Sequence, residues 1–403
     1  MKTYLVGGAV RDRLLGLPVH ERDWLVTGAS AQDLLDLGYR QVGREFPVFL
    51  HPETSEEYAL PRYNPLPADE QAQIETDLTH RDLTINAMAI DPDGELIDPL
   101  SGQRDLEQRL LRHTPSFSED PIRILRLARF AARYADRGFR IADETVALIQ
   151  QMVADDRLKS LIPERVWSEL SRALDGPNPR RFFEALRDCH ALKCILPELD
   201  RLFGVPQPEV HHPEIDTGLH TLMVLDQACL LSSDPEVRFA ALLHDIGKGT
   251  TPPEKWPRHI GHEKRSAKLV KAICQRLRIP NRFRDLARLV AENHTNCHKA
   301  PELKPGTLLK ILIALGALKR PERLEQFLLA CKADSAGREG FEHQPYPQAD
   351  FFRATCKAAT AVDAASLARQ TEDKSKLPAM ITRQRVRAIA EMKLNWPDFQ
   401  TGK

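Results

Sequence analysis

The sequence predicts a small α/β unit followed by a long, mostly helical region. Within the first hundred residues, short β-like runs alternate with amphipathic helical stretches. From about residue 105 the β signal fades, and apolar residues recur with a period of about 3.6, as in helices that bury one face. With 403 residues, the chain is long enough for roughly two or three domains, each with its own core.

The elements follow one another in a simple order. The β-like runs lie at residues 4–6, 24–27, 47–50 and 58–60, and the helical stretches between them lie at 9–15 and 31–37. Further helices are predicted at 148–162, 182–196 and 286–294. Residues 203–216 concentrate proline and charge, which predicts a linker between a middle helical region and a C-terminal helical domain.

Composition excludes several classes of protein. The 57 Lys and Arg residues balance 57 Asp and Glu, so no global field draws the chain to nucleic acid or to a membrane, and any basic surface is local. Charged residues by position 12 and the lack of an apolar run of about 18 residues argue against a signal peptide and a membrane span. Seven cysteines without a C-x-x-C pair predict reduced thiols in a cytoplasm, with no zinc site built from them.

A pair of glycines, Gly7 and Gly8, separates the first β-like run from the first helical stretch. Such a turn leaves backbone N–H groups open toward a triphosphate, and Arg11 would neutralise its charge. The same pattern is also typical of an ordinary turn between a strand and a helix. Both interpretations stay open on this motif alone.

Two carboxylates, Glu21 and Asp23, stand at the start of the second β-like run. Residues two apart in a strand point to the same face, so these side chains can hold one metal pair, as two-metal nucleotidyl transfer requires. The alternative is that they only solvate the entry to a strand. The glycine turn upstream favours the metal-binding interpretation.

Charged side chains accompany two apolar segments further along the chain. His80, Arg81 and Asp82 precede the apolar run to Met88, a placement that is costly in a core and useful around a ribose and phosphates. After Pro121, a predicted helix places four arginines on one face, at positions 123, 126, 129 and 133, with no acid among them. This stripe predicts contacts to phosphates, and the alternative is neutralisation by acids from elsewhere.

The C-terminal half carries a histidine and aspartate pattern. It comprises His220, the doublet His244-Asp245, His259, His262 and His294, and then Asp334. The doublet follows an apolar run, where a buried charged pair needs a metal or a partner. The pattern resembles the HD metallophosphohydrolase domain, in which a divalent metal activates water against a phosphoester. His211, His212 and His298 receive no role.

Taken together, the motifs resemble the bacterial tRNA nucleotidyltransferases, the CCA-adding enzymes of class II. The motifs are GGAVRD, ERDW, HRDLTINAMA, EDPIRILRLARFAARY, PERVW, HPEIDTGLHTL and LLHDIGKG, so the resemblance covers nearly the whole chain. It implies an α/β nucleotidyltransferase head (polymerase-β-like), then a mostly α-helical neck and body, and an all-α HD domain. The implied boundaries are 1–110 for the head, 111–205 for the neck and body, 217–340 for the HD domain and 341–403 for a helical tail.

The resemblance also implies roles for individual residues. Glu21 and Asp23 would be catalytic and hold Mg²⁺, although Glu21 stands where Asp is usual and His80 where Arg is usual. A divalent metal in the HD domain, with Ni²⁺ and Mg²⁺ as candidates, would be held by His220, His244, Asp245 and Asp334. Asp120 and Arg123 would read the base edge, within a nucleotide-binding set of Gly8, Arg11, Arg81, Asp82, Glu119, Asp120, Arg123, Arg126 and Arg129.

The implied activity is addition of C, C and A to tRNA from CTP and ATP without a template, in the cytoplasm. The HD domain would add phosphatase and 2′,3′-cyclic phosphodiesterase activity, and a homodimer is a candidate assembly. Two alternatives remain, a related poly(A) polymerase and an HD phosphohydrolase whose head has decayed into a nucleotide sensor. The E-D-x-x-R element at 119–123 and the HD domain argue against the first, and retention of the head motifs argues against the second.

A third alternative concerns the last nucleotide. Residues 63–80 contain no Gly, Lys or Arg, and Pro65 and Pro67 stiffen the segment. Resembling enzymes carry a basic, glycine-rich flexible loop here that helps the pocket switch from cytosine to adenine, and enzymes that add only CC lack it. The chain is therefore either a CC-adding enzyme or a CCA-adding enzyme in which neighbouring residues supply the switch.

Overall fold

The computed structural model describes residues 1–42, 48–61, 67, 69–210, 212–370 and 373–397. The chain forms two compact units. The first comprises Met1–Leu161 with Arg181–Cys194, and the second comprises Ile162–Arg180 with Ile195–Lys403. No helix among the described residues combines the length and the apolar character needed to cross a membrane.

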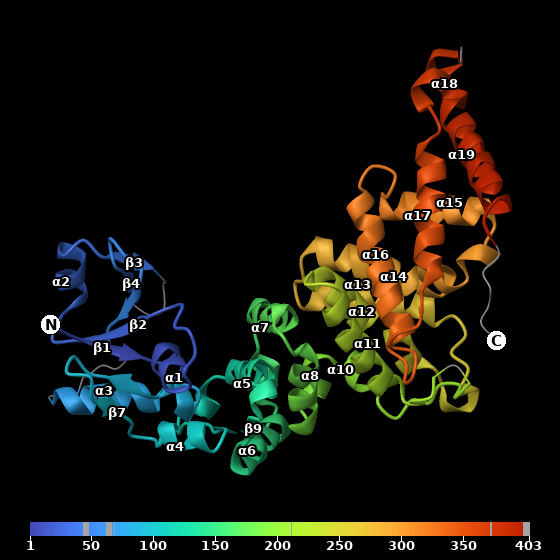
Figure 1. The fold of residues 1–403 in the computed structure, drawn as a ribbon. Helices are drawn as coiled ribbons and strands as arrows, with labels where there is room; N and C mark the ends of the chain where they lie inside the picture. Colours follow the sequence, from blue (N-terminus) through green and yellow to red (C-terminus); the bar gives the residue numbers. More distant parts are fainter. Residues whose placement is uncertain (43–47, 62–66, 68, 211, 371–372, 398–403) are drawn as a thin grey trace. The chain divides into compact units, whose positions relative to one another are not determined.

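A seven-stranded mixed sheet forms the centre of the first unit, with strand order β3-β4-β5-β2-β1-β6-β7 (Figure 1). Strands β2 and β5 run parallel, and the other paired neighbours are antiparallel. The four β-like runs predicted from the sequence are confirmed as β1, β2, β4 and β5. The strands are β1 (Lys2–Val6), β2 (Asp23–Thr27), β3 (Arg40–Val42), β4 (Val48–Leu50), β5 (Glu57–Ala59), β6 (Ala89–Ile90) and β7 (Leu96–Ile97).

Side chains on both faces of this sheet are buried, because successive strand residues point in opposite directions. Leu25 of β2 packs with Leu78 of helix α3 (Glu70–Thr79). Val26, the next residue, packs instead with Leu34 of helix α2 (Ala31–Asp36). Each such buried side chain contributes roughly 1.5–3 kcal/mol relative to an exposed one. These contacts hold β2, and with it the predicted catalytic carboxylates at its start, in the middle of the sheet.

Two predicted helices are interrupted. Residues 148–162 and 182–196 each have a continuous helical pattern, yet α6 ends before Asp156 and α8 ends before His190. These two residues have φ values of 58° and 59°, which a right-handed helix cannot accommodate. A second, two-stranded sheet pairs β8 (Leu110–Leu111) with β9 (Arg140–Ile141). The other α-helices before residue 196 are α1 (Gly8–Leu14), α4 (Gly102–Glu107), α5 (Ile122–Arg133), α6 (Asp143–Ala154), α7 (Pro163–Asp175), α8 (Pro179–Asp188) and α9 (Leu192–Ile195).

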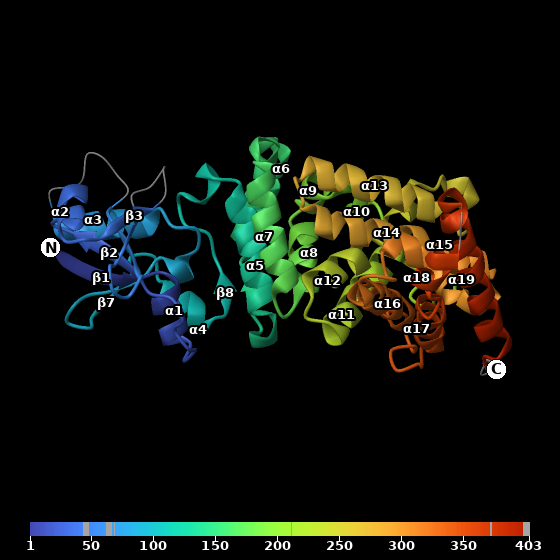
Figure 2. The same ribbon diagram turned by 90° about the horizontal axis from the view of Figure 1, so that it is seen from above.

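The second unit is built from helices, and α11, α12, α14 and α16 pack against one another at its centre (Figure 2). Small side chains allow the close approach, with Val224 and Ala228 of α11 against Ala241 of α12 and Ala333 of α16. The helix predicted at 286–294 is confirmed within α14. The helices are α10 (Pro197–Asp200), α11 (Thr217–Leu231), α12 (Pro235–Leu243), α13 (His262–Arg276), α14 (Asn281–His298), α15 (Pro305–Leu315), α16 (Pro321–Ala336), α17 (Pro347–Thr360), α18 (Ala364–Gln370) and α19 (Leu377–Leu394).

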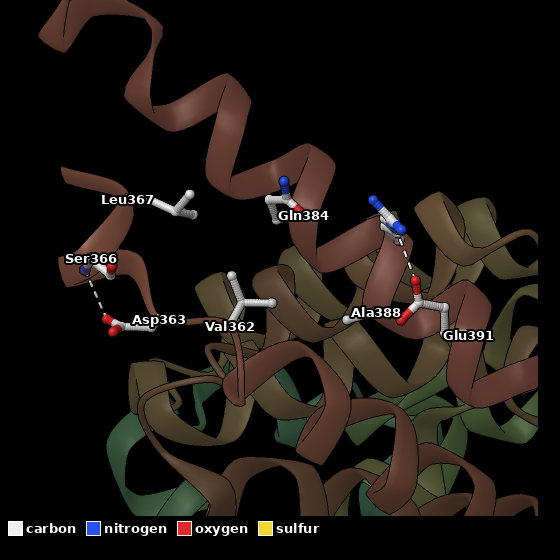
Figure 3. A pocket seen from close by; sticks show the side chains of 8 residues that line it. Val362, Asp363, Ser366, Leu367, Gln384, Ala388 and Glu391 are labelled. Carbon is white, nitrogen blue, oxygen red and sulfur yellow. Dashed lines mark hydrogen bonds and ion pairs between the residues drawn. The ribbon is translucent and has the colours of Figure 1, made fainter. Parts of the chain in front are cut away.

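A shallow pocket of about 450 Å³ lies between α18 and α19 near the C-terminal end (Figure 3). Val362, Leu367 and Ala388 form its apolar part. At its rim, Arg387 donates to Glu391 at 2.9 Å, within the same helix. The pocket therefore offers a mixed surface whose charges are already paired locally.

Candidate active sites

A tight glycine turn joins β1 to α1. Gly7 has a φ of 69°, a conformation that residues other than glycine rarely adopt. A Cβ atom at Gly7 would lie 2.7 Å from Nη1 of Arg81, and one at Gly8 would lie 3.3 Å from Nη2 of Arg11. The turn therefore packs directly against the guanidinium groups of two residues from the predicted nucleotide-binding set.

Arg11 is only 3% exposed, and protein acceptors hold its guanidinium group. Nη1 donates to Oδ1 of Asn86 at 2.6 Å, and Nε donates to Oδ1 of Asp12 at 2.9 Å. Asp12 also accepts from Tyr134 and Arg133, each at 3.1 Å. Burial raises the pKa of Tyr134 to about 12, so its hydroxyl stays a donor. This network ties α1 to the end of α5.

A second network surrounds the motif of residues 80–88. Arg81 pairs with Asp77, one helical turn earlier, at 3.1 Å. Asp82 is buried, and its carboxylate accepts from Arg126 at 2.8 Å and from Asn86 at 2.9 Å. Burial alone would raise the pKa of Asp82, but the Arg126 charge and these hydrogen bonds outweigh it and lower the pKa to about 2. Asp82 therefore orients Arg126.

The predicted arginine stripe on α5 is divided among different partners. Arg126 pairs with Asp82, and Arg133 pairs with Asp12. The Arg129 guanidinium lies 4.9 Å from the centre of the Phe130 ring. For Arg126 and Arg133 the structure thus follows the alternative interpretation, in which acids from other elements neutralise the face. These acids come from distant sequence positions, so the local pattern could not reveal them.

The first residues of the E-D-x-x-R element lie just before α5. Glu119 is exposed, while Asp120 accepts a hydrogen bond from the Ile122 backbone N–H at 3.2 Å. Arg123 donates through Nη1 to the Arg81 carbonyl at 2.9 Å and through Nη2 to the His80 carbonyl at 2.8 Å. Arg123 thus clamps the backbone of the preceding motif, a contact that the sequence analysis did not anticipate.

Three carboxylates approach one another at the start of β2. Glu21 and Asp23 are both exposed, and Asp23 pairs in register with Glu57 at the start of β5. Partial burial, with the neighbouring charges of Asp23 and Glu21, raises the pKa of Glu57. The sequence analysis missed Glu57, whose signal was an acidic residue at the start of a β-like run. Clustered oxygen ligands of this kind suit a hard divalent cation such as Mg²⁺.

In the second unit, the structure brings together the four residues predicted as HD metal ligands. Nε2 of His220 lies 3.3 Å from Oδ1 of Asp334, and Nε2 of His244 lies 3.4 Å from the same oxygen. Nε2 of His244 also lies 3.2 Å from Oδ2 of Asp245. They come from α11, the end of α12 and α16, which are neighbours in the central packing.

Asp245 and Asp334 of this cluster line a cavity of about 300 Å³, and several other polar residues complete its lining. Nε2 of His298 lies 2.7 Å from Oδ2 of Asp334, and Nδ1 of His298 contacts the Tyr346 hydroxyl at 2.9 Å. The sequence analysis gave His298 and His212 no role, yet both line the cavity, and His211 lies outside the described residues. The further lining residues are Lys248, His262, His294, Thr295, Ser335, Arg338 and Gln348.

His259 behaves differently from the other histidines. One of its ring nitrogens contacts the Thr251 hydroxyl at 3.0 Å, and the other contacts the Pro206 carbonyl at 2.9 Å. Both nitrogens are therefore used by structural hydrogen bonds, and His259 is not among the cavity-lining residues. Its part in the sequence pattern is structural.

The electrostatics of the cluster suit a divalent cation. Burial opposes the charged form of Asp245 and Asp334, yet the cations around them hold the pKa of both well below the ordinary value. For His244, burial is outweighed by the two carboxylates, which raise its pKa to about 10. Nε2 of His244 and Oδ1 of Asp245 are buried without a hydrogen-bond partner. Buried imidazole and carboxylate groups that lack a hydrogen-bond partner are suited to bind a metal.

The predicted linker at 203–216 is part of this site instead of a spacer. Oε1 of Gln207 accepts from Lys248 at 2.7 Å, and Glu214 contacts both His212 and His220 at 3.0 Å. Pairing of Pro206 with Asp216 folds the segment back on itself. Proline and charge content correctly indicated an irregular segment. They could not show that its polar side chains contact the residues in and around the cavity.

All seven cysteines lie in the described part of the chain and are free thiols. Burial raises the pKa of Cys189 and Cys274 to about 12, which keeps both thiols protonated. Within the described residues, the metal-competent clusters consist of histidine and carboxylate, without cysteine.

Three known sequence families match successive parts of the chain. Residues 3–112 match the poly A polymerase head domain. Residues 138–203 match the family described as "Probable RNA and SrmB-binding site of polymerase A". Residues 217–334 match the HD domain. The predicted catalytic carboxylates, Glu21 and Asp23, therefore fall in the first match, and the histidine and aspartate cavity falls largely in the third.

Close relatives extend along the whole chain. The Multifunctional CCA protein of Thioalkalivibrio sulfidiphilus is 58% identical over 407 residues, which cover 98% of this chain and 100% of the relative. That of Alkalilimnicola ehrlichii is 55% identical over 408 residues, covering 98% and 99% of the two chains.

Solved structures share the fold. A CCA-adding enzyme in complex with CTP superposes with a TM-score of 0.68 at 20% identity, covering 99% of this chain and 88% of that one. The Thermotoga maritima CCA-adding enzyme complexed with tRNA gives a TM-score of 0.64 at 18% identity, covering 98% and 88%. The polymerase-β-like head, the helical body and the HD domain predicted from the sequence are thereby confirmed.

Proposed function

The chain belongs to the family of multifunctional CCA proteins, and from this premise we propose that it completes the 3′ end of tRNA with CMP and AMP, using CTP and ATP without a template. It is a tRNA nucleotidyltransferase with an HD domain. The observation that carries the proposal is the register of β2 against β5, which gathers Glu21, Asp23 and Glu57 beside the glycine turn. We propose that it acts on tRNA in the cytoplasm.

In the head, Glu21 and Asp23 are the residues that would hold Mg²⁺, with Glu57 beside them. Bound there, the ion would lower the pKa of the attacking 3′-hydroxyl and neutralise phosphate charge. Arg126, fixed by Asp82, would present oriented donors to a nucleotide. Arg11, held by Asp12 and Asn86, would supply a buried positive charge beside the glycine turn. The proposed nucleotide-binding set is completed by Gly8, Arg81, Asp82, Glu119, Asp120, Arg123 and Arg129.

Base choice is proposed to depend on Asp120 and Arg123. A carboxylate can accept from the exocyclic amine that cytosine and adenine share, and a guanidinium can donate to ring acceptors. In this structure Arg123 donates to the carbonyls of His80 and Arg81. Base reading by Arg123 therefore requires some of its donors to turn from these carbonyls to the base, whereas Asp120 already lies at the start of α5.

The second unit is proposed to hydrolyse phosphomonoesters and 2′,3′-cyclic phosphates at tRNA ends. His220, His244, Asp245 and Asp334 would hold the divalent metal, with Ni²⁺ and Mg²⁺ as the candidates. When bound, the metal would supply a water molecule of lowered pKa. Lys248 contributes a buried positive charge at the same cavity, with Nζ 2.5 Å from Oδ2 of Asp245. Such hydrolysis would suit the trimming of damaged ends before nucleotides are added.

A specific observation favours the CC-adding alternative. Glu70–Thr79, within the segment that replaces the flexible loop, is a helix, and its Ile74 and Leu78 are buried in the core of the head. Only residues 60–69 remain to connect β5 to α3, and 62–66 and 68 lie outside the described residues. In sequence this connection is short and contains three prolines, without the glycines of a flexible loop, which favours the CC-adding alternative.

One assay tests the proposal. The full chain is incubated with tRNA transcripts lacking CCA, CA or A, together with labelled CTP and ATP. Incorporation of CMP on the first two transcripts supports nucleotide addition to tRNA. Processive addition of AMP alone would instead identify a poly(A) polymerase, and binding of nucleotides without any incorporation would identify a degenerate head.

A further inference from the structure

A second pocket in the second unit contains none of the residues predicted to bind nucleotide or metal. Its volume is about 610 Å³. This Trp256 pocket is lined by Thr250, Thr251, Pro252, Glu254, Lys255, Trp256, Arg258, Ile260 and Arg265. It combines an aromatic ring with several cations, and therefore differs in chemistry from the histidine and aspartate cavity.

The Trp256 pocket and the histidine and aspartate cavity share the same two walls. The 3₁₀ helix η5 (Ile246–Thr250) places Lys248 in the lining of the cavity and Thr250 in the lining of the pocket. Helix α13 contributes His262 to the cavity and Arg265 to the pocket. These two residues are three apart, so they lie on the same side of the helix. A ligand that extends beyond the cavity along these walls would reach the pocket.

Uncharged acceptors hold the guanidinium group of Arg265. Nε donates to Oγ1 of Thr250 at 2.9 Å, and Nη2 donates to Oγ1 of Thr251 at 2.7 Å. Nη1 donates to the carbonyl of Ile260 at 2.8 Å. Because none of these acceptors carries a charge, the bonds orient the guanidinium group without neutralising it.

Positive charge is in excess around the Trp256 pocket. Lys255 and Arg258 are exposed on one turn, in which the Arg258 N–H donates to the Lys255 carbonyl at 2.9 Å. The lining contains one acid, Glu254, against the three cations. Within the part of the chain that the structure describes, no carboxylate forms an ion pair with Lys255, Arg258 or Arg265. The pocket is therefore complementary to a ligand with several negative charges, such as a nucleic-acid backbone.

Trp256 supplies a flat apolar surface between these charges. Its Nε1 donates to the carbonyl of Thr251 at 3.0 Å, which fixes the ring. The residue is half-buried, and no ring or cation among the described residues stacks on it. Ile260, in the same lining, is 85% exposed. A fixed aromatic ring beside cations is the combination with which proteins bind single-stranded nucleic acids, since bases stack on the ring and phosphates contact Lys and Arg.

We propose that the Trp256 pocket binds the nucleotide just upstream of the 3′ end when the end of an RNA strand occupies the histidine and aspartate cavity. Trp256 would stack on the base, and Lys255, Arg258 and Arg265 would contact the adjoining phosphates. The inference rests on the proposed hydrolysis of phosphoesters at tRNA ends and deepens it, because it makes a single-stranded RNA end a better substrate than a mononucleotide. Stacking tolerates every base, so the pocket would select a strand and not a sequence.

Two substrates test the proposal on the full chain. One is a short single-stranded RNA that ends in a 2′,3′-cyclic phosphate, and the other is 2′,3′-cyclic CMP, which has no upstream nucleotide. Trp256→Ala, and Lys255→Ala combined with Arg258→Ala, should each lower kcat/KM for the RNA at least about fivefold and leave that for cyclic CMP unchanged. The control combines Lys264→Ala with Lys268→Ala, which removes two exposed charges of α13 outside the pocket and should change neither value.

Salt dependence separates the phosphate contacts from the stacking. Loss of two phosphate contacts on a single strand lowers the slope of log KM against log salt concentration by about 1.4. We expect this change for the RNA in the variant that lacks Lys255 and Arg258, and an unchanged slope in Trp256→Ala. An unchanged slope in both variants would show that the two cations do not contact the RNA.

A photocrosslink gives a measurement that does not depend on hydrolysis. The same RNA, with iodouridine at the position before its last nucleotide, should attach to Trp256 on irradiation, and mass spectrometry of the digested chain locates the attachment. If the parent hydrolyses neither substrate, the proposed hydrolase is wrong and the crosslink decides the inference. Attachment at Trp256 then supports the RNA site, and attachment elsewhere overturns it.

The remaining outcomes concern the inference alone. If the RNA is hydrolysed equally well by the parent and by both pocket variants, the inference is overturned and the proposed hydrolase stands. If Trp256→Ala fails to fold, it loses hydrolysis of both substrates. The variant of Lys255 and Arg258 then decides, because both side chains are exposed and make no ion pair among the described residues.

Discussion

Nε of Arg126 donates to Oδ2 of Asp82 at 2.8 Å, across 44 residues of sequence. The acceptor is buried and the donor is partly exposed, with side-chain exposures of 6% and 39%. The bond therefore anchors one end of Arg126, whose side chain as a whole stays partly exposed. Loss of this bond should therefore lower the free energy of unfolding of the first unit.

We expect Asp82→Asn to destabilise the first unit by roughly 2 kcal/mol at pH 7. The pKa of Asp82 in the folded chain is about 2, below its ordinary value of 3.8. A lowered folded-state pKa contributes stability that is complete above about pH 4 and is lost as the pH falls toward 2. Hydrogen exchange of amides 83–90 at pH 7 and pH 3, with exposed Asp93→Asn as control, measures this. An equal difference at both pH values would contradict it.

Asp23→Ala should abolish nucleotide addition and leave phosphoester hydrolysis nearly intact. Asp23 lies in the first unit, and the histidine and aspartate cavity lies in the second. Labelled CMP incorporation and hydrolysis of a 2′,3′-cyclic phosphate are measured on the same preparation, with Asp93→Ala as an exposed carboxylate control. Loss of both activities in a folded variant would show that the sites are not independent.

The converse holds for His244→Ala and Asp245→Ala. Each removes a ligand from the cavity, so hydrolysis of the cyclic phosphate should disappear while CMP incorporation continues at the wild-type rate. His343→Ala, at an exposed histidine, should change neither activity. Hydrolysis that survives in both cavity variants would place the hydrolase elsewhere.

Asp120→Ala should relax base choice more than it weakens triphosphate binding. A lost contact to a base edge removes about 1–3 kcal/mol of discrimination.

For Arg123→Ala we expect relaxed base choice together with a lower rate for every nucleotide, because the backbone of His80 and Arg81 also loses the hydrogen bonds that Arg123 donates. Incorporation of CTP, ATP, UTP and GTP is compared across the variants. If UTP and GTP stay as strictly excluded as in the wild type, side chains do not act as the template.

If the CC-adding alternative holds, terminal AMP addition should be slow or absent while CMP addition is efficient. The connection between β5 and α3 is short and proline-rich, and the following helix is part of the core. Rates are measured on tRNA ending in CC with ATP and on tRNA lacking CCA with CTP. AMP addition at a rate comparable to CMP addition would rule out the CC-only alternative and establish full CCA synthesis.

Local patterns in the sequence predicted much of the architecture. Strand alternation located β1 and β2, and the HD pattern identified four side chains that do converge, although they span residues 220 to 334. Periodicity failed where a single positive φ interrupts a helix, as at Asp156 and His190. The apolar residues keep their helical spacing through such a break, because the helical segments before and after it both bury one apolar face.

Partners that come from distant positions could not be predicted in this way. The arginine stripe of α5 was recognisable, but its acids, Asp12 and Asp82, lie far from it in sequence. Glu57 was hidden for the same reason, since only the pairing of β5 with β2 places it beside Asp23. His298 received no role from the sequence, because only the packing of α14 against α16 brings it to Asp334.

The contacts that α5 makes with Asp12 and Asp82 set a limit on how the protein can be divided. The sequence match to the head ends at residue 112, whereas Arg126 and Arg133, which pair with these acids, lie beyond it. A fragment cut at 112 would leave the buried carboxylate of Asp82 without Arg126 and would leave Asp12 with Arg11 alone. It would also remove Arg123 from the His80 and Arg81 carbonyls. The head family match is therefore shorter than the unit that these contacts hold together, and we expect an autonomous catalytic fragment to extend through α5.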